Sequence, residues 1–181
     1  DRDTTDHCED LLLDNQACFA LHSTSLMMTK VYKPLLQALG LTYPQYLAMM
    51  VLWEKDGLTV GEISTRLLTD PGSLTPLLKR LEGEGLLSRT RSREDERVVI
   101  VELTAQGRAL KDKARTVPQC ILGASGFTLQ RLQNLQAELQ ALRDVFAPFP
   151  VTDSAFEADD ADDRARVEVL LNGVASGMTQ L

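Results

Sequence analysis

Residues 11–22 read LLLDNQACFALH, and they contain Cys18, one of three cysteines in a chain of 181 residues. Asp14 or Asn15 is a suitable residue to begin a helix here, which places the Cys18 thiol in its first turns, among apolar neighbours. A thiol in such surroundings is an inert packing group, a metal ligand or a reactive nucleophile. Because the dipole at a helix N-terminus favours the thiolate, the position is compatible with reactivity.

Cysteine and histidine spacing argues against a metal site around this thiol. The three cysteines, Cys8, Cys18 and Cys120, form neither an even disulfide framework nor a C-x-x-C pair. A zinc site made of His7, Cys8, Cys18 and His22 fits none of the usual ligand spacings. We therefore expect no metal and no cofactor, and a reducing, cytoplasmic location. The acidic N-terminus does not resemble a signal peptide, and no apolar run predicts a membrane span.

Two tyrosines are candidates to contact the thiol. Tyr32 lies 14 residues after Cys18 on the same predicted helix, which corresponds to roughly 21 Å along its axis. It therefore cannot touch Cys18 of its own chain, but in a twofold dimer with antiparallel crossing helices it could reach the partner's thiol. Tyr43 follows the predicted helix break and could arrive beside it.

The elements that must position these residues are mainly helical. Apolar spacing, caps and breakers predict helices over 15–38, 44–57, 59–68, 103–114 and 127–146, with two short strands within 88–103. A further helix is predicted within 69–87, where Gly83 or Gly85 closes it. Thr59 and Glu62 have the spacing of a capping box, and Thr104 is a suitable N-cap. The predicted fold class is mainly α with a small β-ribbon, a winged helix-turn-helix joined to a helical dimerisation region.

The segment 72–84 has the sidedness of a DNA-recognition helix. At 100° per residue, Leu74, Leu77, Leu78 and Leu81 fall on one side. The other side carries small, hydroxyl and cationic residues that suit the major groove, namely Gly72, Ser73, Thr75, Pro76, Lys79 and Arg80. Pro76 lies in the helix interior if Asp70 is the N-cap, and in the first turn if Ser73 is.

The predicted ribbon is rich in arginine. Arg89, Arg91, Arg93 and Arg97 could contact phosphates or enter a narrow minor groove, and Asp95 could hold the Arg97 guanidinium. By itself, such a run is more often a solvated charged hairpin. Combined with the preceding helices it indicates double-stranded DNA as the partner.

The acidic charge is concentrated at the two ends of the chain. The formal net charge of −7 comes from residues 1–15 and 150–181, at −5 each, whereas residues 16–149 carry +3. Overall acidity therefore does not exclude a DNA-binding middle. We divide the chain into an acidic arm (1–12), a dimerisation and sensing helix (13–43), a winged helix-turn-helix (44–104), C-terminal dimerisation helices (105–148) and an acidic tail expected to be poorly ordered (149–181).

Several of these segments resemble a known family. The run from Asp95 and Arg97 through Leu103, Thr104 and Gly107 is similar to the wing signature of the MarR family of bacterial repressors, and TDPGSLTPLLKRLEGEGLLSRTRSREDERVVIVELT resembles its recognition helix and wing. The upstream run LDNQACFALHSTSLMMTKVYKPLLQALGLTYPQYLAMMVLWE resembles the organic-hydroperoxide-sensing, OhrR-like branch. The resemblance covers about residues 11–146.

This resemblance implies a redox switch. In the OhrR-like branch the cysteine of an N-Q-x-C-F motif is hydrogen-bonded by two tyrosines, which match Tyr32 and Tyr43, and His22 stands where a tyrosine is common. An organic hydroperoxide would oxidise Cys18 to a sulfenic acid. Cys120 is either the resolving thiol of the other subunit or a buried small residue, and an external thiol is the alternative partner.

The function we infer is a homodimeric, cytoplasmic repressor of a pseudo-palindromic operator, released by organic hydroperoxide, and not an enzyme. One alternative is a MarR-type repressor released by a small lipophilic or phenolic ligand. Others are a thiol peroxidase, which would consume peroxide without binding DNA, and a plain dimeric interaction module.

Overall fold

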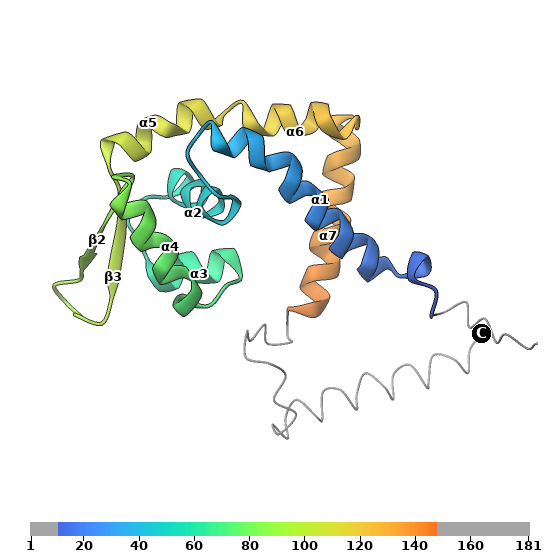
Figure 1. Cartoon of the computed structure of the whole chain (residues 1–181). Helices are drawn as coiled ribbons and strands as arrows, with labels where there is room; N and C mark the ends of the chain where they lie inside the picture. The colour runs from blue at the N-terminus through green and yellow to red at the C-terminus, as the bar shows by residue number, and fades with distance from the viewer. Residues whose placement is uncertain (1–10, 148–181) are drawn as a thin grey trace, which may run out of the picture. The chain divides into compact units, whose positions relative to one another are not determined.

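The computed structural model describes residues 11–147, and the expected acidic tail and most of the acidic arm lie outside them (Figure 1). A 3-10 turn, η2 (Leu13–Asn15), leads into helices α1 (Ala17–Gln37) and α2 (Tyr43–Glu54). The next elements are a short strand β1 (Leu58–Thr59) and helices α3 (Val60–Leu67) and α4 (Pro71–Gly83). Strands β2 (Leu87–Arg91) and β3 (Val99–Leu103) precede helices α5 (Ala105–Ala114), α6 (Val117–Ser125) and α7 (Leu129–Phe146).

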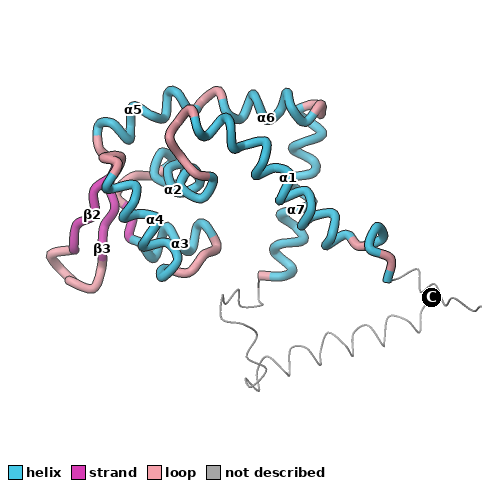
Figure 2. Tube along the Cα trace, in the orientation of Figure 1, coloured by secondary structure: helices cyan, strands magenta, loops and turns pink. Residues whose placement is uncertain are grey.

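The strands form one small antiparallel sheet in the order β1-β3-β2, beside an otherwise helical fold (Figure 2). In the β2–β3 hairpin Leu87 pairs with Leu103 and Arg91 pairs with Val99. The mainly α fold with a β-ribbon, predicted from the sequence, is confirmed. Strand β1 was not predicted, because two residues carry no readable periodicity.

Local capping explains several helix ends. Thr42 and Gln45 form a capping box on α2, and Thr59 and Glu62 form the predicted one on α3. Thr104 accepts a hydrogen bond from the Gly107 amide at the start of α5, as predicted.

The predicted start of the first helix is wrong. Asp14 and Asn15 lie in η2, and α1 begins at Ala17 with Gln16 as its N-cap. The Asn15 amide donates to the carbonyl of Leu12, which closes the 3-10 turn before the α-helix starts.

One other predicted helix is too long, because the second helix ends at Glu54, before Gly57. The fourth helix ends at Gly83, one of the two glycines expected to close it, and Leu87 is in strand β2. Gly85 has φ +75°, a left-handed conformation that a glycine adopts without strain and that turns the chain out of α4.

The core is built around α2, which packs against α1, α3, α4 and α5. Its fully buried large side chains are Leu36, Met49, Leu52, Ile63, Leu74, Leu78, Leu81, Leu87 and Val101. Figure 1 shows α5 and α6 following one another away from the sheet, with α7 turning back after α6. Within residues 11–147, no helix has both the length and the apolar character needed to cross a bilayer.

Helices α1 and α7 leave apolar side chains uncovered in the single chain. Exposed residues on α1 include Phe19, Leu21, Leu26, Met27, Met28 and Val31, and on α7 they include Leu135, Leu139, Leu142 and Phe146. Apolar stripes of this extent are typical of surfaces that another protein chain covers.

Candidate functional site

Helix α4 begins at an aspartate cap. The Asp70 carboxylate accepts a hydrogen bond from the Ser73 amide at 2.9 Å and one from the Ser73 hydroxyl at 2.6 Å. Pro71 occupies the first turn, where a proline costs little. Because Asp70 is the cap, Pro76 lies inside the helix and removes one backbone hydrogen bond. The choice left open by the sequence is thereby decided in favour of Asp70.

The two sides of α4 are those that the sequence predicts. Leu74, Leu78 and Leu81 are buried, and Leu77 is half-buried against the core. Ser73, Pro76, Lys79 and Arg80 are exposed on the other side. Thr75 is half-buried, and its hydroxyl donates to the Pro71 carbonyl at 2.8 Å.

The tip of the β2–β3 hairpin is held by its own backbone and short side chains. The Ser92 amide donates to the Val98 carbonyl at 2.8 Å, and the Arg97 amide donates to Asp95 Oδ1 at 3.0 Å. Asp95 therefore orders the tip through the backbone of Arg97, whereas the sequence suggested a contact with its guanidinium. Arg93 and Arg97 are exposed at this tip.

Two of the predicted arginines have partners within the protein. Arg89 is paired with Glu82 of α4: its amide donates to Glu82 Oε2 at 2.7 Å and its guanidinium Nη2 donates to Oε1 at 3.0 Å. These hydrogen bonds from Arg89 lower the pKa of Glu82 below its usual range. Arg91 makes a weaker bond, from Nη1 to the Glu96 carbonyl at 3.4 Å.

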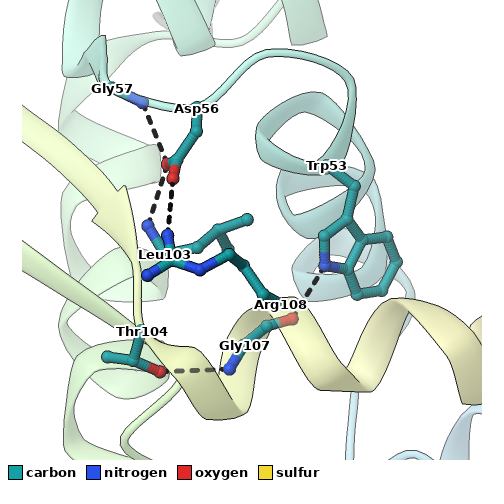
Figure 3. Close-up of polar contacts among 7 residues, drawn as sticks. All are labelled: Trp53, Asp56, Gly57, Leu103, Thr104, Gly107 and Arg108. Carbon is teal, nitrogen blue, oxygen red and sulfur yellow. Dashed lines mark hydrogen bonds and ion pairs between the residues drawn. The ribbon is translucent and has the colours of Figure 1, made fainter.

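A polar network joins α2, β3 and α5 next to the ribbon (Figure 3). Asp56 Oδ1 accepts from the amides of Gly57 and Leu103 at 2.9 and 2.8 Å, and Oδ2 pairs with Arg108 at 3.1 Å. The Trp53 indole donates to the Gly107 carbonyl at 2.9 Å. The network ties the base of the ribbon to the helix that leads into α6.

Tyr32 and Tyr43, the two candidate contacts of the thiol, lie side by side in one chain. Their ring centroids are 4.9 Å apart, and the Tyr46 ring lies 6.2 Å from that of Tyr32. Burial, with the neighbouring phenols, raises the pKa of Tyr32 to about 12, and burial also raises the pKa of Tyr43. Both hydroxyls therefore keep their protons at neutral pH and remain hydrogen-bond donors.

The Cys18 thiol is in the first turn of α1 and is exposed in the single chain. Helix α1 runs without a break from Ala17 to Gln37, so Tyr32 of the same chain is roughly 21 Å away by helical rise. Cys120 lies in α6 and is also exposed, so it is not a buried packing group in the single chain. His22 is exposed one helical turn after Cys18. Residues 11–147 bring no group of three metal-binding side chains together, and His7 and Cys8 lie outside them.

Sequence reasoning missed the residues that hold this region together, chiefly Glu82, Asp56 and Trp53. Glu82 was one of many acidic residues, and nothing in its spacing from Arg89 indicated a bond. Asp56 precedes a glycine that ends a helical segment, which is a local signal for a turn but not for a bond to Leu103.

A compact helical unit followed by a β-hairpin with exposed arginines defines a winged helix-turn-helix transcriptional regulator. A family model described as the transcriptional regulator SarA/Rot matches residues 30–114. The organic hydroperoxide resistance transcriptional regulator of Bacillus subtilis is 50% identical over 130 residues, which are 72% of this chain and 88% of that protein.

Solved structures agree with this assignment. Reduced AbfR bound to DNA is 33% identical, with a TM-score of 0.62 over 76% of this chain and 96% of that one. Disulfide-formed AbfR is 34% identical, with a TM-score of 0.54 over 74% and 94%. A MarR-family regulator from Rhodococcus shares the fold at 21% identity, with a TM-score of 0.66 over 73% and 95%.

The chain therefore belongs to the family of the organic hydroperoxide resistance transcriptional regulator, and it shares its fold with a MarR-family regulator. The resemblance read from the sequence is confirmed. The matching family model and this relative are both described as transcriptional regulators.

Proposed function

We propose that this protein is a homodimeric repressor that binds a pseudo-palindromic operator and leaves it when an organic hydroperoxide oxidises Cys18. The observation that carries the proposal is the pairing of Tyr32 and Tyr43, whose ring centroids are 4.9 Å apart, on a chain whose own Cys18 is roughly 21 Å along α1 from Tyr32. Two neighbouring tyrosines can offer hydroxyl donors to a thiolate, and Cys18 could be that acceptor only if it came from a second copy of the chain. The uncovered apolar stripes of α1 and α7 support the same dimer.

The DNA-binding part of the proposal rests on α4 and the ribbon. Lys79 and Arg80, with Ser73, Thr75 and Pro76, would face the major groove, and Arg91, Arg93 and Arg97 would reach the flanking backbone or minor groove. The reduced, DNA-bound form of AbfR supports this assignment. The domain division follows: 13–43 and 105–148 dimerise and sense, and 44–104 contacts DNA.

The chemistry balances with hydroperoxide as the oxidant. The Cys18 thiolate attacks one peroxide oxygen, the O–O bond breaks, and the alkoxide leaves as the alcohol after taking a proton, so that Cys18 becomes a sulfenic acid. A second thiol can then attack the sulfenic sulfur and expel water. We assign this role to Cys120 of the other subunit, and the disulfide-formed AbfR supports a disulfide route.

Cys18→Ser tests the proposal. The variant should bind DNA like the wild type but stay bound after stoichiometric cumene hydroperoxide, and intact mass should show an added oxygen or a cross-linked dimer in the wild type only. Cys120→Ser should prevent the cross-link but still accept the oxygen. Release of Cys18→Ser by the peroxide would overturn thiol sensing.

A second candidate function is release by a small lipophilic ligand. One observation favours it: an open cavity of about 370 Å³ between α2 and the end of α5, lined by Tyr46, Met50, Trp53, Glu54, Lys111, Ala114 and Arg115. Normal release of Cys18→Ser by a phenolic compound such as salicylate, without added peroxide, would support this candidate.

A further inference from the structure

Glu82 and Arg89 join the recognition helix to the wing. Glu82 is in the last turn of α4, and Arg89 is in the middle of β2. Both carboxylate oxygens of Glu82 accept hydrogen bonds from Arg89, one from its backbone amide at 2.7 Å and the other from its guanidinium at 3.0 Å. We refer to this pair as the Glu82–Arg89 clip.

The Glu82–Arg89 clip differs from an ordinary surface ion pair, because the Arg89 side chain is mostly buried. The Arg89 side chain is only 20% exposed, and its Nε is buried without a partner. An unpaired buried donor is costly, so the position of this side chain is held against a local penalty. Strand β2 is at the edge of the sheet, so Glu82 also satisfies an amide that has no partner in the β2–β3 ladder.

The clip lies between the two elements that are proposed to contact DNA, the recognition helix α4 and the wing. A recognition helix and a wing engage one duplex together only when the spacing between them is held. The exposed cations Arg91, Arg93 and Arg97 lie on the hairpin that begins with β2. Displacing β2 from α4 would therefore move these cations relative to Lys79 and Arg80.

We propose that the Glu82–Arg89 clip sets the position of the wing relative to the recognition helix, and that Arg89 is a positioning residue and not a phosphate contact. The proposal rests on the proposed DNA-binding function. It assigns Arg89 a different role from the other ribbon arginines, with which the sequence grouped it.

Glu82→Gln separates positioning from simple electrostatics, because the two predict opposite signs. Removing an acid near DNA should tighten binding if charge alone matters. Loss of the clip should instead weaken binding to a duplex that helix and wing must engage together, by about fivefold. Glu84→Gln is the matched control. Glu84 is an exposed acid one residue after α4, so its substitution removes the same charge without touching the clip.

The measurement uses the full chain and two fluorescein-labelled duplexes, one recovered by in-vitro selection from a randomised pool and one of random sequence. Glu82→Gln should lose about fivefold on the selected duplex and nothing on the random one. A variant that is merely less folded would lose the same factor on both, so the ratio isolates positioning. Glu84→Gln should leave both affinities unchanged or slightly tighter.

The salt dependence of binding tests Arg89 directly. Each phosphate contact contributes about 0.9 to the slope of log K against log salt concentration. Arg93→Gln should reduce the slope by about 0.9, whereas Arg89→Gln should weaken binding to the selected duplex with the slope unchanged. Arg89→Lys keeps the positive charge but loses the guanidinium that bonds Glu82, so it should weaken binding to the selected duplex as Glu82→Gln does. It replaces Arg89→Gln or Glu82→Gln in the test if either of those variants fails to fold.

Distinct results overturn the two proposals. If the wild type enriches no duplex, the DNA-binding function fails. If the wild type binds but Arg89→Gln lowers the slope by about 0.9, or Glu82→Gln tightens selected binding as Glu84→Gln does, the clip proposal alone is wrong.

Discussion

Gly107 is buried in the first turn of α5, and Gly107→Ala should destabilise the protein more than the same substitution at an exposed position in a first helical turn. An added Cβ would lie 1.9 Å from the Leu86 carbonyl oxygen and 2.9 Å from its carbon, both backbone atoms. Contacts of a Cβ below 3.0 Å are essentially never found, so α5 would have to withdraw from Leu86 by about 1 Å. A backbone neighbour cannot rotate away as a flexible side chain can.

The withdrawal disrupts hydrogen bonds as well as packing. The Trp53 indole bond to Gly107 is 2.9 Å long, and the amide of Thr104 donates to the same Leu86 carbonyl at 3.1 Å. Overpacking costs about 1–3 kcal/mol, and each strained bond costs about 0.5–1.5 kcal/mol. The higher helix propensity of alanine returns about 1 kcal/mol. We expect the free energy of unfolding to fall by about 3 kcal/mol.

Urea unfolding followed by tryptophan fluorescence measures this change, since Trp53 is the only tryptophan and lies at the site. The midpoint should fall by roughly 1–2 M. Protein concentration must be held constant if the chain dimerises. Gly61→Ala is the matched control, because Gly61 is also in the first turn of a Thr-capped helix but its Cβ would meet only Thr59 Oγ1, at 3.8 Å. Stability of Gly107→Ala within about 0.5 kcal/mol of the wild type would refute the reasoning.

Three further changes have expected outcomes. Leu68 has φ +55° and is 58% exposed, so Leu68→Asn should raise the urea midpoint by relieving about 0.5–1 kcal/mol of strain, and a lower midpoint would contradict this. Burial raises the pKa of Tyr32 from its ordinary value of 10.0 to about 12. Ionisation of Tyr32 should therefore leave the free energy of unfolding unchanged below pH 10 and lower it as the pH rises from 10 to 12, which unfolding measured from pH 8 to 12 would show. Tyr32→Phe should remove part of that decline, and an identical pH profile would count against it. Asp56→Asn loses the ion pair with Arg108 but keeps an acceptor for the Leu103 amide, so the melting temperature should fall by only roughly 2–4 °C, whereas Asp56→Ala should cost clearly more.

Features that depend on neighbouring residues could be predicted from the sequence. The leucine side of α4 follows from helical periodicity, because residues three and four apart share a face whatever surrounds the helix. The Thr59–Glu62 capping box needs only three residues of spacing, and it forms as expected. The separation of Cys18 and Tyr32 is likewise a property of one helix.

Ambiguous local signals were decided by geometry that spacing does not specify. Both Asp70 and Ser73 were suitable caps, and Asp70 is the cap because its carboxylate accepts from the Ser73 amide and hydroxyl together. Near Cys18 a suitable cap residue is not used as one: Asn15 is a residue type that often caps helices, but it lies in a 3-10 turn and α1 starts after it.

What the sequence determined by itself is the kind of protein, through the periodic helices, the arginine-rich hairpin and the motif around Cys18. Only the tertiary structure decided which charged and polar groups meet: Arg89 with Glu82, Trp53 with Gly107, and Tyr32 with Tyr43. The physical reason is that periodicity constrains directions within one element. A bond between elements depends instead on how closely their backbones pack. The sequence indicates such close packing only at single positions such as Gly107, where a side chain would clash with the backbone of Leu86.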